Sequence, residues 1–585
     1  MVWVAITLAT LAAGVAVGAV QESADDARLH YLRAAYHFQS GNPHQALSEL
    51  RLAIEADPES ARLRTAEAMM LLSLSRPEEA VAALELALEL DPEDAEAHRL
   101  LGRVYMQRGG GDDDLRLAEE SLRRAAELDP DDRASLFFLS LLYDRAGRLT
   151  EAIEVRRRLL TLDPSLLNVW LELSSNFRQL GDLEGESEAL GRAADIDPDD
   201  VELQRRAGLA AERLGRLPQA FAFYDRAREL LQRQIAARTD DIALRLQLAD
   251  LCLRQTGQFD IAAQQFGRAL ELAEEAGAAA ASLTTLAEAA IGRAAALYLM
   301  EDYEPAAELF ERAEELVQAR PDVFLRMLIT AYSRSDRRAR ALEILDELES
   351  QYRPDSAPFS MFERLRARVL DSEGRYEEAD RILEELISSD PGENENYIEL
   401  CQLRLGREDY AGAAAALDAS EAGAGGSDDV TFLRGVVQER GSDFAAARAT
   451  FSSIIEGDPL NHLALNYLGY MLADRGVELE TALGYIRRAI ELQPYSGSYL
   501  DSLGWAHFKL GELEPAERYL TAAVRTQYMS AEVREHLGYL YLALERPAEA
   551  LAEFRAAMAN DLASVKSTAE VEEEIARLER LLGER

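Results

Sequence analysis

Small and apolar residues recur along this chain in a pattern with a period close to 34 residues. Asp-Pro pairs show the period most directly, because the first five lie 34, 38, 34 and 34 residues apart. Their prolines are Pro58, Pro92, Pro130, Pro164 and Pro198. Alanines precede four of them by five residues, at Ala53, Ala87, Ala125 and Ala193. Because proline is excluded from helix interiors, each period predicts two helices followed by a turn.

Two short motifs repeat inside this period. Leu101-Gly102-x-x-Tyr105 and Leu537-Gly538-x-x-Tyr541 mark first helices, and Ala220-x-x-x-Tyr224-x-x-Ala227 and Ala550-x-x-x-Phe554-x-x-Ala557 mark second helices. Glycine and alanine fit where two helices cross closely, and the larger apolar residues fill the space between neighbouring pairs. In its period and in these motifs the chain resembles the tetratricopeptide repeat (TPR) proteins.

The resemblance implies an all-α fold, a right-handed α-solenoid superhelix of about fifteen TPR helix-turn-helix units. We expect the units to begin near residues 27, 61, 95, 133, 167, 201, 243, 287, 322, 360, 394, 428, 462, 497 and 531. The tail from Ser567 to Arg585 is predicted to be a final amphipathic helix, with Val571, Ile575, Leu578 and Leu582 on one stripe. A terminal repeat needs such a capping helix because its outer face has no next neighbour.

The period fails at a few places, and these suggest divisions of the array. The spacing is 42 residues from Ala227 to Ala269 and 44 from there to Ala313, which predicts lengthened second helices. A glycine- and acid-rich insert stretches unit three at 109–114, and an Ala/Gly run lies at 422–426. We therefore divide the chain into a leader at 1–22, units one to six at 27–238, units seven to eleven at 239–420, a flexible Gly/Ala linker at 421–427, units twelve to fifteen at 428–562 and a capping helix at 563–585.

The leader is apolar from Val2 to Val20 and carries no charged side chain. Nineteen helical residues span roughly 28 Å, just enough to cross a bilayer core. Small residues at its end fit a cleaved signal peptide, and its length fits an uncleaved membrane anchor; a soluble capping helix is a third interpretation. The segment lacks the basic start of a typical signal, so the start codon is open to question.

Charge and composition exclude several classes of function. With 63 basic and 106 acidic residues, the net charge is −43, which argues against nucleic acid or anionic lipid as the main partner. Two cysteines, Cys252 and Cys401, argue against a disulfide scaffold and a thiolate zinc site, and seven scattered histidines argue against an imidazole metal site. The sequence shows no phosphate-binding loop, nucleophile elbow or His-Glu-x-x-His helix. We expect no catalytic residue, metal or cofactor.

The resemblance implies that partners bind along a concave face built from the first helices of the units. In units three to ten, arginines gather at the corresponding positions. A groove of arginines fits an acidic peptide, a C-terminal carboxylate or another anion. In the alternative, these arginines pair with neighbouring acids. The candidates are Arg178, Arg205, Arg206, Arg213, Arg254, Arg326, Arg334, Arg364 and Arg368.

Units thirteen to fifteen carry aromatic and polar residues at the same positions. Aromatic groups with polar neighbours are typical binding anchors, although such rings also fill gaps between helices. The candidates for a peptide-binding groove are Asn466, Tyr467, Tyr470, Asp501, Trp505, Phe508, His536 and Tyr539. The runs 466–470 and 501–505 resemble a module of bacterial envelope-associated TPR proteins.

These observations favour a non-catalytic scaffold that binds peptide segments or partner helices, in bacterial envelope assembly. It would lie in the periplasm, or be anchored in a membrane and face the periplasm. A self-associating structural solenoid is one alternative. A cytosolic TPR adaptor is another, if the assigned start codon lies too far upstream. The identity of the partner and the oligomeric state do not follow from the sequence.

Overall fold

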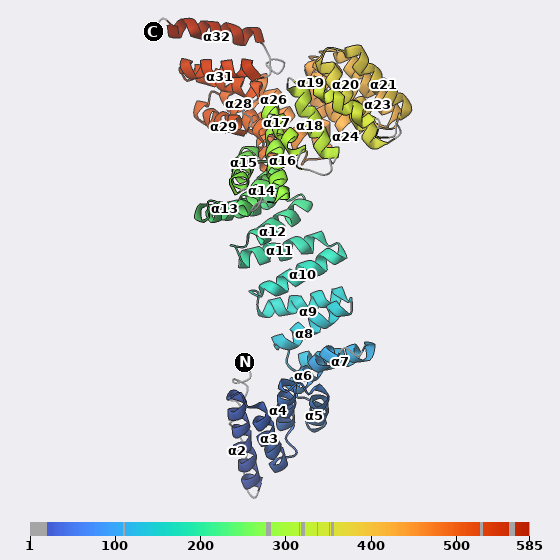
Figure 1. Cartoon of the computed structure of the whole chain (residues 1–585), viewed down its shortest axis with the longest axis vertical. Helices are drawn as coiled ribbons and strands as arrows, with labels where there is room; N and C mark the ends of the chain where they lie inside the picture. The colour runs from blue at the N-terminus through green and yellow to red at the C-terminus, as the bar shows by residue number, and fades with distance from the viewer. Residues whose placement is uncertain are drawn as a thin grey trace. The chain divides into compact units, whose positions relative to one another are not determined.

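The computed structural model describes residues 20–108, 111–276, 282–314, 316, 322–335, 337–349, 351–352, 356–526, 530–560 and 568–583. These residues are helical, with short connections and no β-strand among them. By their internal contacts they form two compact units, which divide between Pro198 and Asp199. Figure 1 labels most of their helices in chain order. Each unit is a row of helix pairs.

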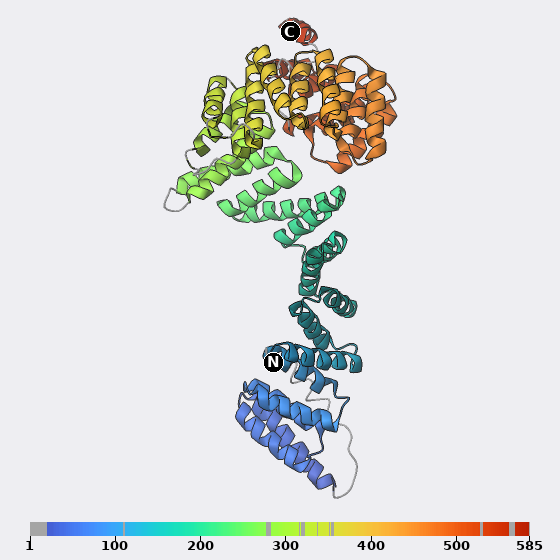
Figure 2. The ribbon, with the colours of Figure 1, turned by 90° about the vertical axis from the view of Figure 1, so that its right-hand side faces the viewer.

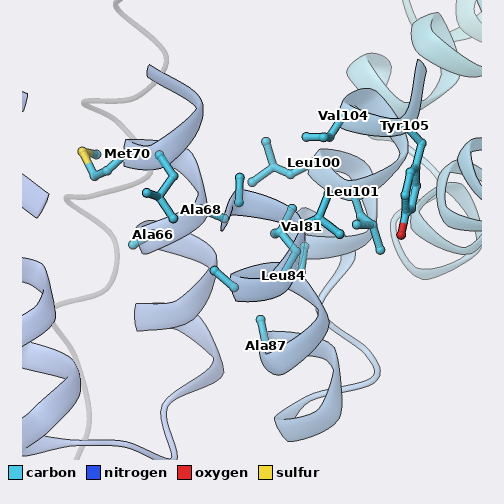
Figure 3. Close-up of a cluster of buried hydrophobic side chains, with 14 of the residues drawn as sticks. Ala66, Ala68, Met70, Val81, Leu84, Ala87, Leu100, Leu101, Val104 and Tyr105 are labelled. Carbon is cyan, nitrogen blue, oxygen red and sulfur yellow. The ribbon is translucent and has the colours of Figure 1, made fainter. Parts of the chain in front are cut away.

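Ten helices of the first compact unit lie among the described residues. They are α2 (Val20–Gln39), α3 (Pro43–Ala56), α4 (Ala61–Ser73), α5 (Pro77–Leu90), α6 (Ala95–Arg108), α7 (Asp112–Leu128), α8 (Arg133–Arg145), α9 (Leu149–Leu162), α10 (Leu167–Leu180) and α11 (Leu183–Ile196). Buried side chains join each helix to the next. Figure 3 shows this packing where Leu84 of α5 lies with Ala68 of α4 and Leu100 of α6. Burying one such leucine stabilises the fold by about 1.5–3 kcal/mol.

The second unit contains the remaining helices. In its first half they are α12 (Val201–Arg213), α13 (Leu217–Ala237), α14 (Ile242–Leu251), a π-helical turn η2 (Cys252–Thr256), α15 (Phe259–Ala276), α16 (Leu283–Leu299), α17 (Tyr303–Glu314), α18 (Asp322–Arg334), α19 (Arg338–Glu349), α20 (Ala357–Ser372) and α21 (Tyr376–Ser389). In its second half they are α22 (Asn394–Gly406), α23 (Tyr410–Gly423), α24 (Asp428–Arg440), α25 (Phe444–Gly457), α26 (His462–Asp474), α27 (Leu479–Leu492), α28 (Gly497–Lys509), α29 (Leu513–Thr526), α30 (Ala531–Ala543), α31 (Pro547–Asn560) and α32 (Thr568–Gly583).

The predicted TPR solenoid is confirmed nearly helix by helix. First helices begin at the expected residue in most units, for example at Ala61, Arg133, Asp322 and Asp428. The helix α32 covers the last pair, and Val571 and Leu578 of its apolar stripe are fully buried. Ser567, the predicted first residue of this capping helix, lies outside the described residues, as do 563–566 and 584–585.

Residues 1–19 of the predicted leader also lie outside the described residues, and residues 20–22 belong to α2. None of the helices that the structure describes is both long enough and apolar enough to cross a membrane. Of the insert at 109–114, residues 112–114 form the first turn of α7. Acidic side chains are favourable there because the N-terminus of a helix carries partial positive charge.

The irregular spacing after Ala227 has two structural causes. The second helix α13 is 21 residues long, against the 14 of second helices such as α5, so the lengthening predicted there is present. The next surplus is divided between α15, with 18 residues, and the first helix α16, with 17. The π-helical turn η2, which follows α14 directly, is a local irregularity that the spacing did not predict.

The two compact units divide after Pro198, and the finer divisions of the repeat array at 238 and 421–427 stay predictions. The boundary after Pro198 lies in the turn between α11 and α12. Residue 238 directly follows the long helix α13, whose side chains share a core with α14 and η2. The predicted linker holds the last turn of α23 and a short connection to α24. Arg434 of α24 forms ion pairs across this connection with Asp418 and Glu421 of α23.

One contact in the second unit joins segments 270 residues apart. The turn before α28 packs against α13, where the Tyr495 hydroxyl donates a hydrogen bond to Asp225. The Tyr495 ring meets Phe221 edge-on at 5.8 Å, and the guanidinium of Arg228 lies 5.7 Å from the ring centre. Figure 2 shows the second unit as a curved row of helix pairs. Curvature of the row brings the sixth and thirteenth repeats of the chain together at this closing contact.

We expect Tyr495→Ala to loosen α13, because this substitution removes both the ring contact and the hydrogen bond. Amides of residues 217–224 should exchange with deuterium faster, with a loss of about 1–3 kcal/mol in protection. Tyr495→Phe keeps the ring and should lose only about 1 kcal/mol. Unchanged exchange in Tyr495→Ala would show that the closing contact contributes nothing to stability.

Candidate functional site

A cleft of the second compact unit lies where the first helices α12, α14 and α16 approach one another. Its volume is about 1020 Å³, and the long second helix α13 forms part of its wall. Leu231 and Leu251, both nearly fully buried, lie at its base, and Ala243, Gln247 and the π-turn residue Gln255 line its sides.

Local sequence signals explain how the cleft is held open. Asp200 and Asp241 cap α12 and α14, because their carboxylates accept hydrogen bonds from the backbone N–H groups of Leu203 and Leu244. The extra turns of α13 carry Gln234 into the wall. At η2 an extra residue enters the helical turn, and Gly257 ends it with a φ of +69°, a conformation that glycine adopts without strain.

Two of the predicted arginines line this cleft, and both are bound to acids. The Arg205 Nε lies 3.0 Å from a carboxylate oxygen of Glu202, and Arg254 pairs with Asp250. The carboxylates of Asp199, Asp200 and Glu288 line the same cleft. Acidic groups therefore outnumber basic groups in the cleft.

The other predicted arginines do not gather in one site. Arg178 binds Glu186 at 2.7 Å, Arg364 binds Glu393 at 2.7 Å, and Arg368 binds both carboxylate oxygens of Glu399. These three arginines therefore pair with neighbouring acids, which is the alternative to an arginine-lined anion groove. Arg206, Arg326 and Arg334 form no ion pair with any described residue, and Arg213 is exposed at the end of α12.

The aromatic candidates of the last repeats form one packed cluster rather than an open surface. The Trp505 ring stacks on His536 at 4.1 Å and on Phe508 at 4.9 Å, and Tyr539 lies 6.4 Å away. Only 7% of Trp505 is exposed, and Asp501 and His536 are buried as well. Tyr470 lies 6.0 Å from His536 and donates a hydrogen bond to Glu532 at 2.6 Å.

The remaining two candidates lie one turn earlier on α26. The Tyr467 ring stacks on Phe451 at 4.7 Å, within the core of the neighbouring repeat. The side-chain oxygen of Asn466 is buried, with no hydrogen-bond partner among the described residues. The structure therefore places most of this aromatic set between helices, as the gap-filling interpretation has it.

A buried ion pair lies at the centre of this cluster. The His536 Nδ1 is 2.9 Å from a carboxylate oxygen of Asp501. Burial by itself lowers the pKa of His536, but the nearby carboxylates of Asp501, Glu532 and Glu535 outweigh burial and raise the pKa above its ordinary value. Burial also raises the pKa of Tyr470, and the hydrogen bond to Glu532 adds to the shift.

The described residues include no group of three or more His, Cys, Asp and Glu side chains placed to hold a metal ion. Both cysteines are buried, and burial raises the pKa of Cys252 to about 12 and that of Cys401 to about 11. Thiols with such pKa values stay protonated near pH 7, so neither cysteine is an activated nucleophile.

Sequence reasoning missed the acceptor side of the cleft. Glu288, Gln247 and Gln255 line it but were not among the candidates. The broken period between Ala227 and Ala313 marked this stretch as different from the other repeats. The repeat register also placed Glu288, the second residue of the unit that begins near 287, on the inner face.

Comparison of the sequence with protein-family models identifies the family to which the chain belongs. Residues 70–109 match a TPR repeat family, and residues 110–166, 171–235, 398–459, 432–497 and 502–562 match a tetratricopeptide repeat family. Together these matches cover more than half of the chain. The chain belongs to the tetratricopeptide repeat proteins. Motif and structure thus agree on the same repeat in both units.

Individual relatives match only parts of this TPR protein or match it at low identity. The TPR repeat-containing protein PA4667 of Pseudomonas aeruginosa is 37% identical over 110 residues, which is 19% of this chain and 18% of that protein. The structure of MamA from Desulfovibrio magneticus RS-1 covers 30% of this chain and 96% of its own, at 21% identity and a TM-score of 0.27. The structure of yeast Tom70 covers 84% and 96%, at 16% identity and a TM-score of 0.33.

Proposed function

We propose that this TPR protein is a non-catalytic scaffold that assembles other proteins by binding their segments along the inner face of its repeats. The cleft of about 1020 Å³ between successive first helices is the observation that carries the proposal. It lies at the upper end of the usual range for small-molecule sites, and its lining mixes charged, amide and apolar groups. Such a lining suits a polypeptide segment, which presents all three kinds of group.

We also propose that the scaffold acts in bacterial envelope assembly, on the periplasmic side of a membrane. The apolar stretch from Val2 to Val20 supports export or anchoring, because it resembles a signal peptide or a single membrane span. Fractionation of the native host tests this location. Recovery of the full chain in the cytosol would favour the adaptor alternative instead.

Affinity capture of the tagged full chain from its native host, after mild crosslinking, tests the scaffold function. We expect a small, reproducible set of envelope proteins, identified by mass spectrometry. Ala243→Trp, which fills the cleft from an exposed position, should lose part of this set, whereas Ala415→Trp on the exposed side of α23 should not. Recovery of the chain alone, together with growth in size at high concentration in light scattering, would favour self-association and contradict the scaffold.

A further inference from the structure

The charges of the cleft between α12, α14 and α16 do not balance. It is lined by the carboxylates of Asp199, Asp200, Glu202, Asp250 and Glu288, against the guanidinium groups of Arg205 and Arg254. Arg205 and Arg254 are held by Glu202 and Asp250 respectively, so each cation already has an anion. The carboxylates of Asp199, Asp200 and Glu288 form no ion pair with any described residue.

A buried hydrogen-bond acceptor in the cleft, like the unpaired carboxylates, favours a ligand that carries donor groups. The side-chain oxygen of Gln255 is buried, and no described residue donates a hydrogen bond to it. A buried acceptor without a donor costs about 1–3 kcal/mol, which a ligand that donates there would recover. Gln255 belongs to the π-helical turn η2, and single π turns inside helices occur frequently at functional sites.

The base of the cleft provides an apolar surface for the ligand. Leu231 and Leu251 lie there beside Ala227, and the half-buried Leu246 lies above them. Lysine and arginine carry a long aliphatic stem below the charged group, and such stems pack on apolar surface while the charge meets polar partners. Their charged groups are donors without any acceptor, so they complement carboxylates and a free amide oxygen.

We propose that this cleft docks an extended partner segment that carries lysine or arginine side chains. The stems lie on the leucines at the base. One charged group donates to the buried oxygen of Gln255, and the others bind Glu288 and the pair Asp199 and Asp200. The inference rests on the proposed scaffold function and names the chemistry of the segment that the scaffold takes. It is opposite in sign to the acidic peptide expected from the arginines, because Arg205 and Arg254 are already bound to acids.

Fluorescence polarisation with labelled peptides tests the proposal on the full chain at 150 mM NaCl. The probes are three twelve-residue peptides of alternating sequence, Lys-Ser, Glu-Ser and Asn-Ser. We expect the Lys-Ser peptide to bind and the other two to bind at least about tenfold more weakly. Ala243→Trp fills the cleft without changing charge and should weaken Lys-Ser binding by about tenfold or more.

Matched variants distinguish binding in the cleft from general attraction of a basic peptide to the chain, whose net charge is −43. The pair Asp199→Asn and Glu288→Gln should weaken Lys-Ser binding by about fivefold to tenfold. The pair Asp429→Asn and Glu377→Gln removes the same charge from exposed positions outside the cleft and should change binding by less than about twofold. Circular dichroism checks that every variant is folded.

Four results would overturn the inference. They are equal loss in both pairs of charge variants, unchanged Lys-Ser binding in Ala243→Trp, preference for the Glu-Ser peptide, and failure of all three peptides to bind. None of these results removes the partners found by affinity capture, so the scaffold function and the basic segment can fail separately.

Discussion

Replacing Gly504 by leucine should unfold the last repeats of the chain. Gly504 lies on α28 against α29, and a Cβ added there would come within 2.7 Å of the Leu520 Cγ and 3.0 Å of its backbone nitrogen. The backbone cannot give way without separating the two helices, so we expect a loss of about 3 kcal/mol or more. Chemical denaturation, with hydrogen exchange across residues 497–526, measures the effect.

Gly484→Leu is the matched control. Gly484 lies on α27, is exposed, and has nothing within 4 Å of an added Cβ. Leucine favours the helix over glycine, so this variant should be as stable as the original or more stable, by up to about 1 kcal/mol. A Gly504→Leu protein as stable as Gly484→Leu would contradict the close helix crossing that defines the repeat.

The second large effect is expected from the buried pair of His536 and Asp501. His536→Gln removes the cation and leaves the carboxylate of Asp501 buried, which we expect to cost about 3–5 kcal/mol. Part of the loss comes from the Trp505 ring, which stacks on His536 at 4.1 Å. Denaturation at pH 6 measures the total against the unsubstituted chain.

The pH dependence of this loss identifies the charge state of His536. Its pKa is raised in the folded chain, so the folded state binds this proton more tightly than the unfolded state does. The stabilisation is therefore fully present below the unfolded pKa of about 6.5, and it is lost as pH rises through the higher folded pKa. We expect the difference between the unsubstituted chain and His536→Gln to shrink as pH rises from 6 to 9. A constant difference would show that His536 is neutral in the fold.

The helices were predictable from the sequence because each repeat contacts mainly its neighbours. The Asp-Pro turns and the small residues at the helix crossings form a local repeat pattern. The helices that start at Ala61, Asp322 and Asp428 begin where this pattern predicts. The closing contact of Tyr495 with Asp225 was not predictable. It joins residues 270 positions apart, and its register follows from the accumulated curvature of many repeats rather than from any local motif.

The candidate site was predictable only in part, for a related reason. The sequence placed Arg205 and Arg254 on the inner face, and both line the cleft. Whether an arginine can bind a ligand depends on which acid lies beside it in space. Arg368, for example, donates a hydrogen bond to Glu399 of the next repeat, 31 residues away. Trp505 likewise occupies an inner-face position but is covered by His536 of the following repeat.

Site-specific photo-crosslinking in the native host tests most directly whether the cleft holds a partner segment. A photoreactive residue in place of Gln247, which is exposed within the cleft, is compared with one in place of Ala415, which is exposed outside it. We predict crosslinks from position 247 to another protein, at peptides rich in lysine or arginine, and few from position 415. Equal crosslinking from both positions, or crosslinks from position 247 to this chain alone, would contradict it.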